Sequence, residues 1–183
     1  MKNLLAPALV CLGLAGCMGY RIGPAKPNYL RDVHSIAIPT FINKTLTPRI
    51  EVLVTDTVIK QFQQDGTYRI VGGERADATL KCEISRITRS PARSVTTNVL
   101  ATSEFNLSMH VKYKLVGPDG KPIGPPGEVV GTTSFFVGTG GTNVSNGTTS
   151  SLIGDVTQDE RQALPLAAEE LANHLVAQLS EGW

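Results

Sequence analysis

The chain has 183 residues, 41% of them hydrophobic and 18% charged, and a formal net charge of +1. This length suits a single domain that can bury a sizeable core. A nearly neutral chain argues against nucleic acid as the main partner, because affinity for nucleic acid depends on neutralising its phosphates.

The N-terminus has the pattern of a bacterial lipoprotein signal. Lys2 precedes an apolar stretch over residues 4–14, and residues 14–17 read Leu-Ala-Gly-Cys, which matches a lipobox. The apolar stretch is too short for a permanent membrane-spanning helix. We therefore expect a signal peptide over residues 1–16, cleavage before Cys17, and attachment of lipid to that cysteine. The alternative is an ordinary signal peptide that happens to contain a cysteine.

Residues 17–31 are expected to form a lipidated tether, because they contain several glycines and prolines and few apolar side chains. Residues 32–183 are expected to make one folded domain. Cys11 belongs to the signal and Cys17 would carry lipid, so Cys82 is left without a disulfide partner. Cys82 lies in an alternating segment and is predicted to be a buried thiol rather than a nucleophile.

The first part of the domain combines short strands with one helix. Residues 33–39 are rich in β-formers and end at a proline, which predicts a strand, and residues 40–48 form a connection. Apolar side chains then recur at helical spacing over residues 50–62. Gly66 ends this helix, because glycine accepts a left-handed cap. A short strand is expected over residues 68–71.

The middle of the domain alternates between apolar and polar side chains. Residues 77–88 and, most clearly, residues 105–115 place apolar side chains on one face and polar ones on the other, as in strands with one buried face. A turn is expected at residues 118–120 and a further strand at residues 128–137. Residues 138–154 are rich in Gly, Ser, Thr and Asn and predict a loop.

The last element is predicted to be a helix. Thr157 and Glu160 have the spacing of a capping box, and an apolar stripe follows from residue 164 to residue 179. Pro165 is unfavourable inside a helix, so either the helix kinks there or its stable part begins there.

This order of elements predicts an α+β fold. We expect a two-layer sandwich in which a small mixed or antiparallel sheet has two helices packed on one face. The strand side chains Leu107, Met109 and Val111 are expected to lie under the apolar stripes of the helices. Those stripes include Leu53, Val54, Leu171 and Leu175.

No constellation typical of an enzyme is visible. The three histidines, His34, His110 and His174, share no metal-ligand spacing. The glycine-rich run at residues 138–141 is not followed by the Lys-Ser/Thr of a phosphate-binding loop. We therefore expect a binding module with no catalytic residues, no metal and no cofactor. A periplasmic hydrolase is the non-binding alternative, and the missing constellation argues against it.

The candidate binding site is a set of basic residues near the end of a predicted hairpin: Arg86, Arg89, Arg93, Lys112 and Lys114. Arginine suits a bidentate grip on phosphate. Strand alternation puts Arg86 in phase with the apolar Ile84, so its charge requires a projecting strand or a β-bulge. The alternative is a solvated hairpin whose charges keep an edge soluble.

Several short motifs resemble those of the LPS-assembly lipoproteins, the LptE family. They are the start Cys17-Met18-Gly19-Tyr20, the strand at residues 36–39, the segment Phe41-Ile42-Asn43-Lys44-Thr45, the closing residues 64–71, and residues 167–172 before the final Gly-Trp. The resemblance covers most of the chain from Cys17 onward. It implies a small sheet with two helices on one face, in agreement with the order of elements.

The resemblance also implies a place and a partner. Members of this family sit at the inner leaflet of the outer membrane, so we expect a lipid-anchored protein on its periplasmic face. Met18 is not the aspartate linked to retention in the inner membrane, which agrees with this location. The resemblance further implies that the chain plugs a large LptD-like β-barrel translocon, helps it to assemble, and contacts lipopolysaccharide. No short site motif of the family maps onto this sequence, so the basic residues remain a separate hypothesis.

The front half of the chain also resembles lipoprotein activators of peptidoglycan synthases and curli-secretion lipoproteins. A strand ending in proline, the Phe-x-Asn-x-Thr segment at residues 41–45, a helix, and a strand after Asp-Gly carry this second resemblance. The long strand at residues 105–115 and the Gly-Trp terminus favour the LptE family. An activator of peptidoglycan synthesis or a curli-type lipoprotein remains the alternative function.

Overall fold

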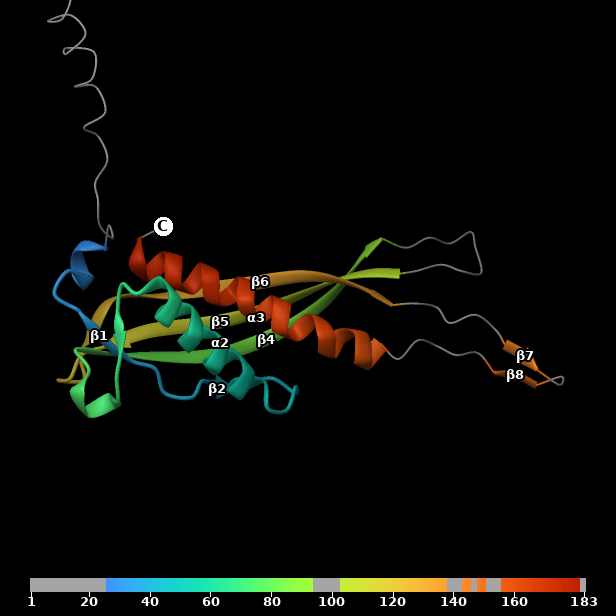
Figure 1. Ribbon diagram of the computed structural model, residues 1–183, viewed down its shortest axis with the longest axis horizontal. Coiled ribbons are helices and arrows are strands. Elements are labelled where there is room, and N and C mark those ends of the chain that lie inside the picture. Colours follow the sequence, from blue (N-terminus) through green and yellow to red (C-terminus); the bar gives the residue numbers. More distant parts are fainter. Residues whose placement is uncertain (1–25, 94–102, 138–142, 146–147, 151–155, 182–183) are drawn as a thin grey trace, which may run out of the picture.

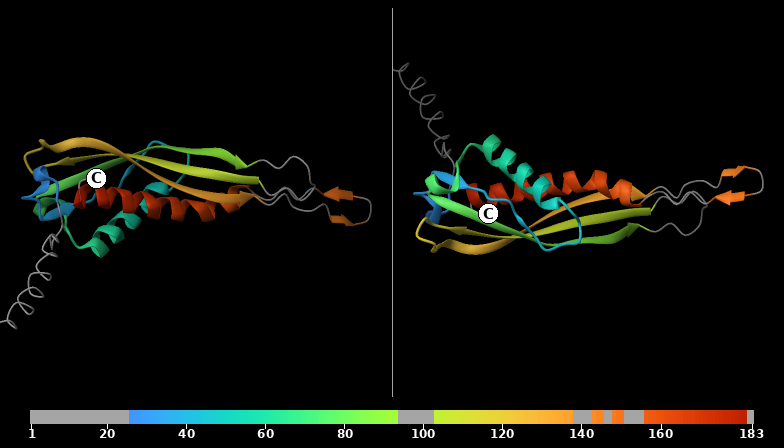
Figure 2. Two further views of the ribbon diagram at one scale, coloured as in Figure 1. Left: turned by 90° about the horizontal axis from the view of Figure 1, so that it is seen from above. Right: turned by 90° about the horizontal axis from the view of Figure 1, so that it is seen from below.

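The computed structural model describes residues 26–93, 103–137, 143–145, 148–150 and 156–181. These residues form two layers, a sheet and a pair of helices that cover one of its faces (Figure 1, Figure 2). The expected α+β sandwich is therefore confirmed. The predicted signal peptide and Cys17 lie outside the described residues.

The main sheet is mixed and has the order β3-β1-β4-β5-β6, with β2 paired to β4. Its strands are β1 (Ser35–Ala37), β2 (Ile42–Asn43), β3 (Arg69–Ile70), β4 (Ala78–Arg93), β5 (Ser103–Val116) and β6 (Pro122–Val137). Strand β1 pairs in parallel with β3 and with β4, and β2 pairs in parallel with β4. Strand β5 pairs antiparallel with β4 and with β6. The three long strands thus make the surface on which the helices pack.

The two helices are α2 (Ile50–Asp65) and α3 (Val156–Ser180). The α2 helix begins after Arg49, whose φ is 62°, and ends at Gly66, whose φ is 72°, so the glycine cap is confirmed. Two short 3-10 helices, η2 (Asn28–Leu30) and η3 (Gly73–Arg75), complete the domain. No helix among the described residues is long and apolar enough to cross a membrane.

The core lies where the expected faces meet. Leu107, Met109 and Val111 of β5 are fully buried against the helical layer. The expected helical partners Val54, Leu171 and Leu175 are also fully buried, whereas Leu53 is half-buried at the margin of the core. The assignment of the β5 faces from sequence alternation is confirmed.

A β-bulge in β4 changes which side chains face the helices. Ile84 pairs with Val111, whereas Arg86 pairs with His110, so Ser85 is an extra residue on β4. An extra residue reverses the alternation beyond it. Arg86 is consequently exposed on the open face of the sheet, and the bulge that its charge required is present.

The start of α3 differs from expectation. The helix begins at Val156, so Thr157 lies inside it and is not its N-cap, and Glu160 bonds to Arg89 rather than closing a capping box. The helix also continues through Pro165 without interruption. Its long apolar face packs on the sheet and on α2, and this burial outweighs the unfavourable proline.

Two other segments are more ordered than expected. The predicted loop at residues 138–154 contains a hairpin of β7 (Asn143–Ser145) and β8 (Thr148–Ser150), and its other residues lie outside the described ones. The predicted tether packs onto the domain at its described end, because Leu30 is fully buried in the core. The folded unit therefore begins before residue 32.

The α3 helix seals the outer edge of β6. The backbone N–H of Thr132 donates to the carboxylate of Glu170, and the His174 Nδ1 lies 2.8 Å from the carbonyl oxygen of Val130. Gly131 between them permits this approach, because a Cβ there would lie 2.0 Å from the Ala167 carbonyl oxygen. Side chains of α3 thus form hydrogen bonds with an N–H and a carbonyl group of β6 that would otherwise be free at a sheet edge.

Candidate functional site on the open face of the sheet

The face of the sheet opposite the helices carries a concentration of positive charge. On β4, Lys81 and Arg86 are exposed on this face, and on β5 Lys112 and Lys114 are exposed there. The register aligns these residues, because β4 and β5 run antiparallel through this region. The structure therefore unites Arg86, Lys112 and Lys114 of the sequence-predicted set and adds Lys81.

The pairing of these charges is electrostatically unfavourable. Lys81 lies directly opposite Lys114, and like charges at directly opposed positions of an antiparallel pair are destabilising. Lys112 lies between Glu83 of β4 and Glu128 of β6 in the register. Among the residues that the structure describes, none of the three lysines forms an ion pair. Three lysines face two glutamates around this part of the open face, and the remaining positive charge favours the approach of an anion.

A groove of about 580 Å³ lies between these side chains. Its volume is within the range of small-molecule sites. Ile42 is 56% exposed and adds an apolar side chain to the basic wall. The groove is lined by Ile42, Lys81, Cys82, Glu83, Lys112, Tyr113, Lys114, Pro126, Gly127 and Glu128. Such a lining suits a ligand that combines negative charge with apolar surface.

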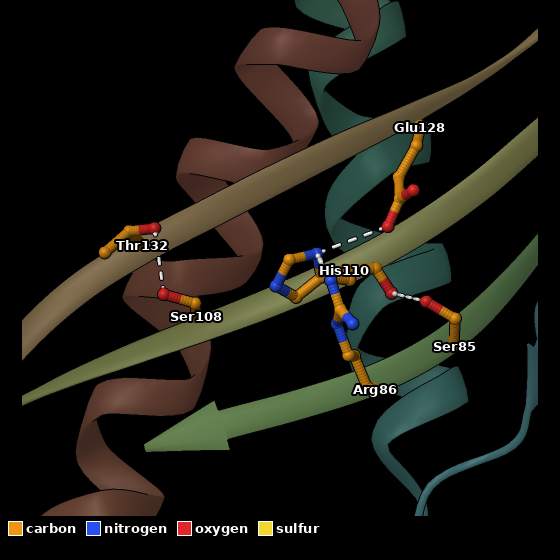
Figure 3. Close-up of polar contacts among 6 residues, drawn as sticks. All are labelled: Ser85, Arg86, Ser108, His110, Glu128 and Thr132. Carbon is orange, nitrogen blue, oxygen red and sulfur yellow. Dashed lines mark hydrogen bonds and ion pairs between the residues drawn. The ribbon is translucent and has the colours of Figure 1, made fainter. Parts of the chain in front are cut away.

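Polar contacts fix the part of the open face next to the groove (Figure 3). The His110 Nδ1 lies 3.3 Å from Glu128 Oε1 and 3.5 Å from Arg86 Nη2. One nitrogen cannot serve both, because it donates to Glu128 when it carries a proton and accepts from Arg86 when it does not. Nearby, the Ser85 hydroxyl donates to the His110 carbonyl oxygen at 3.3 Å. The tautomer of His110 therefore decides whether its Nδ1 pairs with Glu128 or with Arg86.

Arg89 lies on the other face of the sheet. Its Nε donates to Glu160 Oε2 at 2.6 Å, and its Nη2 contacts Glu160 Oε1. The hydrogen bond to Glu160 raises the pKa of the Arg89 guanidinium. Arg93 ends β4, and its side chain lies outside the described part of the chain. The expected basic set is therefore divided, and Arg89 is satisfied within the fold.

Sequence reasoning missed Lys81, Glu83 and Glu128 as members of the site. The alternation over residues 77–88 puts Lys81 and Glu83 on the polar face of the strand, but only the β4–β5 register shows that Lys81 lies opposite Lys114. Ile42 was assigned to a connection, whereas it lies in β2 and reaches the groove. The exposure of this apolar side chain could not be read from its neighbours in sequence.

Groups suited to catalysis are few in the described ranges. Burial raises the pKa of the Cys82 thiol, so this cysteine is a buried, protonated side chain. Burial likewise raises the pKa of Tyr113, whose hydroxyl donates to Gln178 Oε1 at 2.8 Å. Within the described residues, no group of three or more His, Cys, Asp or Glu side chains could hold a metal ion.

The domain is thus a small α+β sandwich with a basic open face. The chain matches the family model described as LptE, lipopolysaccharide-assembly, over residues 33–179. It belongs to this family of accessory lipoproteins of lipopolysaccharide assembly. No curated protein matches the chain.

Solved structures share the fold at low sequence identity. A protein described as a neuraminyllactose-binding hemagglutinin homolog from Helicobacter pylori is 12% identical, with a TM-score of 0.53, over 89% of this chain and 93% of that chain. A minor lipoprotein from Acinetobacter baumannii is 11% identical, with a TM-score of 0.49, over 81% and 93%. The PelC dodecamer from Paraburkholderia phytofirmans is 16% identical, with a TM-score of 0.45, over 88% and 94%. At 12% identity the likeness to the Helicobacter pylori protein is one of fold alone.

Proposed function

We propose that this chain is an outer-membrane lipoprotein that assists lipopolysaccharide transport as the plug and assembly partner of an LptD-like β-barrel translocon. In this proposal, lipid on Cys17 holds the chain at the periplasmic face of the membrane. The open face of the sheet then contacts the phosphates of lipopolysaccharide. The family match supports the pathway. The observation that carries the proposed contact is the set of three unpaired lysines around the groove.

Phosphate fits this site for a physical reason. An anion between Lys81 and Lys114 replaces their mutual repulsion with two charge-assisted hydrogen bonds. Lys112 borders the same groove, and the exposed Ile42 offers apolar contact to a ligand that also carries acyl chains. Arg86 extends the positive surface along β4. Lipopolysaccharide combines phosphate groups with acyl chains and so matches both parts of the lining.

The shape of the domain supports the role of a plug. Its three long strands and α3 run along one axis, so the domain is elongated (Figure 1). The open face is polar and needs no further apolar cover, because the core lies on the helical side. A narrow body with a charged surface can fill a water-lined lumen.

Charge reversal on the open face tests the contact with lipopolysaccharide. We expect Lys112→Glu/Lys114→Glu to weaken binding of purified lipopolysaccharide at low salt by at least about tenfold, the effect of losing one charge-assisted hydrogen bond. The matched control is Lys60→Glu/Arg161→Glu, which makes the same charge change at exposed positions on the two helices. Equal binding by the reversed variant and the wild type would show that this face is only a solvated surface.

Affinity capture tests the partner. The lipidated protein isolated from solubilised outer membranes is expected to retain the β-barrel translocon. Recovery of a penicillin-binding protein in place of the barrel would instead support the alternative, an activator of peptidoglycan synthesis.

A further inference from the structure

A second hollow lies at the end of the domain where the described chain begins. Its volume is about 430 Å³, and it is lined by Arg69, Ile70, Val71, Gly72 and Arg75. These residues belong to β3, to η3 and to the link between them. The strand β3 pairs with β1, which lies at the opposite end of the molecule from the β7–β8 hairpin (Figure 1). The hollow is thus remote from the tip of the long strands.

Two arginines of this hollow have free guanidinium groups. Arg69 and Arg75 are exposed, and among the described residues neither side chain forms a hydrogen bond or an ion pair. Their backbones are nevertheless fixed, because the Arg69 N–H donates to the His34 carbonyl oxygen and the Arg75 N–H donates to that of Gly72. Two positioned cations therefore flank a hollow with their donors unused.

Nearby carboxylates do not occupy these donors. Asp77 accepts hydrogen bonds from the backbone of His34 and from the backbone and hydroxyl of Ser35. Glu74 immediately precedes Arg75 in the sequence, but among the described residues it forms no ion pair with either arginine. Arg89 and Arg31, by contrast, bond to Glu160 and Asn28 within the fold. The hollow is therefore a local excess of positive charge.

The described chain begins at the same end of the domain as this hollow, where Lys26 packs over the buried Tyr68 on the helical side of the sheet. Lys26 Nζ lies 4.5 Å from the centre of the Tyr68 ring and donates to the Val33 carbonyl oxygen at 2.9 Å. Tyr68 immediately precedes Arg69, and its hydroxyl donates to the Leu179 carbonyl oxygen at 2.6 Å. The nine Cα–Cα steps from Cys17 to Lys26 can span about 30 Å at most. A lipid on Cys17 would thus hold the hollow near a membrane surface.

We propose that Arg69 and Arg75 bind the phosphate of an anionic headgroup in the membrane to which the chain is anchored. Arginine presents a planar fork of donors that matches phosphate oxygens. The tether brings such headgroups within reach, which favours a membrane source over free phosphate. This inference rests on the proposed lipid anchor and gives the domain a second attachment to the membrane besides its acyl chains. Two attachments would fix the orientation of the domain relative to the membrane as well as its distance from the membrane surface.

Vesicle binding by the unlipidated chain tests this site. Residues 17–183 carrying Cys17→Ser are sedimented at low salt with vesicles of phosphatidylglycerol and phosphatidylcholine, or of phosphatidylcholine alone. Arg69→Gln/Arg75→Gln should reduce the partition onto the anionic vesicles by about 30-fold, at roughly a factor of five for each basic residue near such a surface. Lys44→Gln/Lys60→Gln makes the same charge change elsewhere and should reduce it far less. An equal reduction by both variants would assign the effect to net charge and overturn the site.

Titration with inorganic phosphate separates the two sources of the anion. Binding of free phosphate that depends on Arg69 and Arg75, without binding to anionic vesicles, would overturn the membrane headgroup as the ligand.

Lipopolysaccharide binding separates this site from the open face. The variant Arg69→Gln/Arg75→Gln should bind lipopolysaccharide as the wild type does. The variant Lys112→Glu/Lys114→Glu should bind lipopolysaccharide more weakly but should still partition onto the anionic vesicles. Loss of lipopolysaccharide binding in the first variant alone would contradict the assignment of both sites.

Discussion

Arg89 and Glu160 join the far half of β4 to the first turns of α3. The Arg89 side chain is 47% exposed and that of Glu160 is 11% exposed, so the pair is only partly screened by water. Two parallel N–H···O contacts fix its geometry. The ion pair with Glu160 explains the position of Arg89 better than a binding role does. A charge reversal at Arg89 would therefore change the stability of the fold as well as any binding.

Removal of the Arg89 side chain should destabilise the domain. We expect Arg89→Ala to lower the free energy of unfolding by about 1 kcal/mol, the upper range for a partly exposed ion pair. Arg86→Ala, on the open face, should change it by less than about 0.5 kcal/mol. Urea denaturation measures both, and the exchange Arg89→Glu/Glu160→Arg should recover part of the loss. Equal values for the two alanine variants would show that the pair does not stabilise the fold.

At Gly131 the backbone of α3 comes close to the sheet. A Cβ at this position would lie 2.0 Å from the Ala167 carbonyl oxygen and 2.6 Å from the Leu171 backbone nitrogen. Both are backbone atoms of a packed helix, so Gly131→Ala should cost on the order of 1–3 kcal/mol by overpacking. Gly72→Ala is the control, because no atom lies within 4 Å of a Cβ there. Thermal melts that do not separate the two variants would contradict the close packing.

At the scale of elements, Asp77 clamps β1 to the start of β4. Hydrogen bonds from the His34 backbone, the Ser35 hydroxyl and the Ser35 backbone, in that order of effect, hold the pKa of Asp77 below its ordinary value of 3.8. A carboxyl whose pKa is lower in the folded state stabilises the fold above its unfolded pKa. This contribution is lost as the pH falls through the folded pKa.

Acid unfolding should reveal the Asp77 clamp. The free energy of unfolding is expected to fall between about pH 5 and about pH 2, and Asp77→Asn should make this fall shallower. Asp56→Asn, an exposed change on α2, is the control and should leave the slope as it is. If Asp77→Asn and the wild type show the same pH dependence, the clamp does not contribute to it.

The two faces of β5 should respond differently to truncation. Leu107 is fully buried, and Leu107→Ala is expected to cost on the order of 2–5 kcal/mol. Ser108 lies on the open face beside Thr132, and Ser108→Ala should change stability by about 0.5 kcal/mol or less. Thermal melting of the two variants checks this, and similar shifts would refute the observed orientation of the strand.

Periodicity predicted most elements because it reports directly which side chains are buried. It placed α2 and β5 correctly, since helical spacing and strict alternation leave little choice of face. The phase of Arg86 required either a projecting strand or a bulge, but only the β4–β5 register could decide between them and place the extra residue at Ser85. It also could not predict that Arg89 meets Glu160, a contact across 71 residues that depends on the reversed alternation.

At the scale of the molecule, η2 and the far ends of β4, β5 and β6 occupy opposite ends of an elongated domain (Figure 2). The helical face holds the core, the open face carries the lysines, and the Arg69 hollow lies at the tether end. In the proposed attachment through Cys17, such a domain would present its open face along its whole length.

Loss of Cys17 should release the chain from the membrane. We expect Cys17→Ala to prevent lipid attachment and to leave the precursor uncleaved or the protein unanchored. Labelling with radioactive palmitate and membrane fractionation measure the two effects, and Cys82→Ala is the control because that thiol is buried. Palmitate on the Cys17→Ala protein would end the lipoprotein hypothesis.

The contacts of Glu170 and His174 with β6 limit how copies of this chain can associate. A fibre built by strand addition needs two free edges on every molecule, one to accept a neighbour and one to offer. Side chains of α3 block β6 midway, and Pro122, Pro125 and Pro126 remove donors from its first part. A molecule with one blocked edge behaves like a chain terminator: it can join a single neighbour but cannot propagate a polymer.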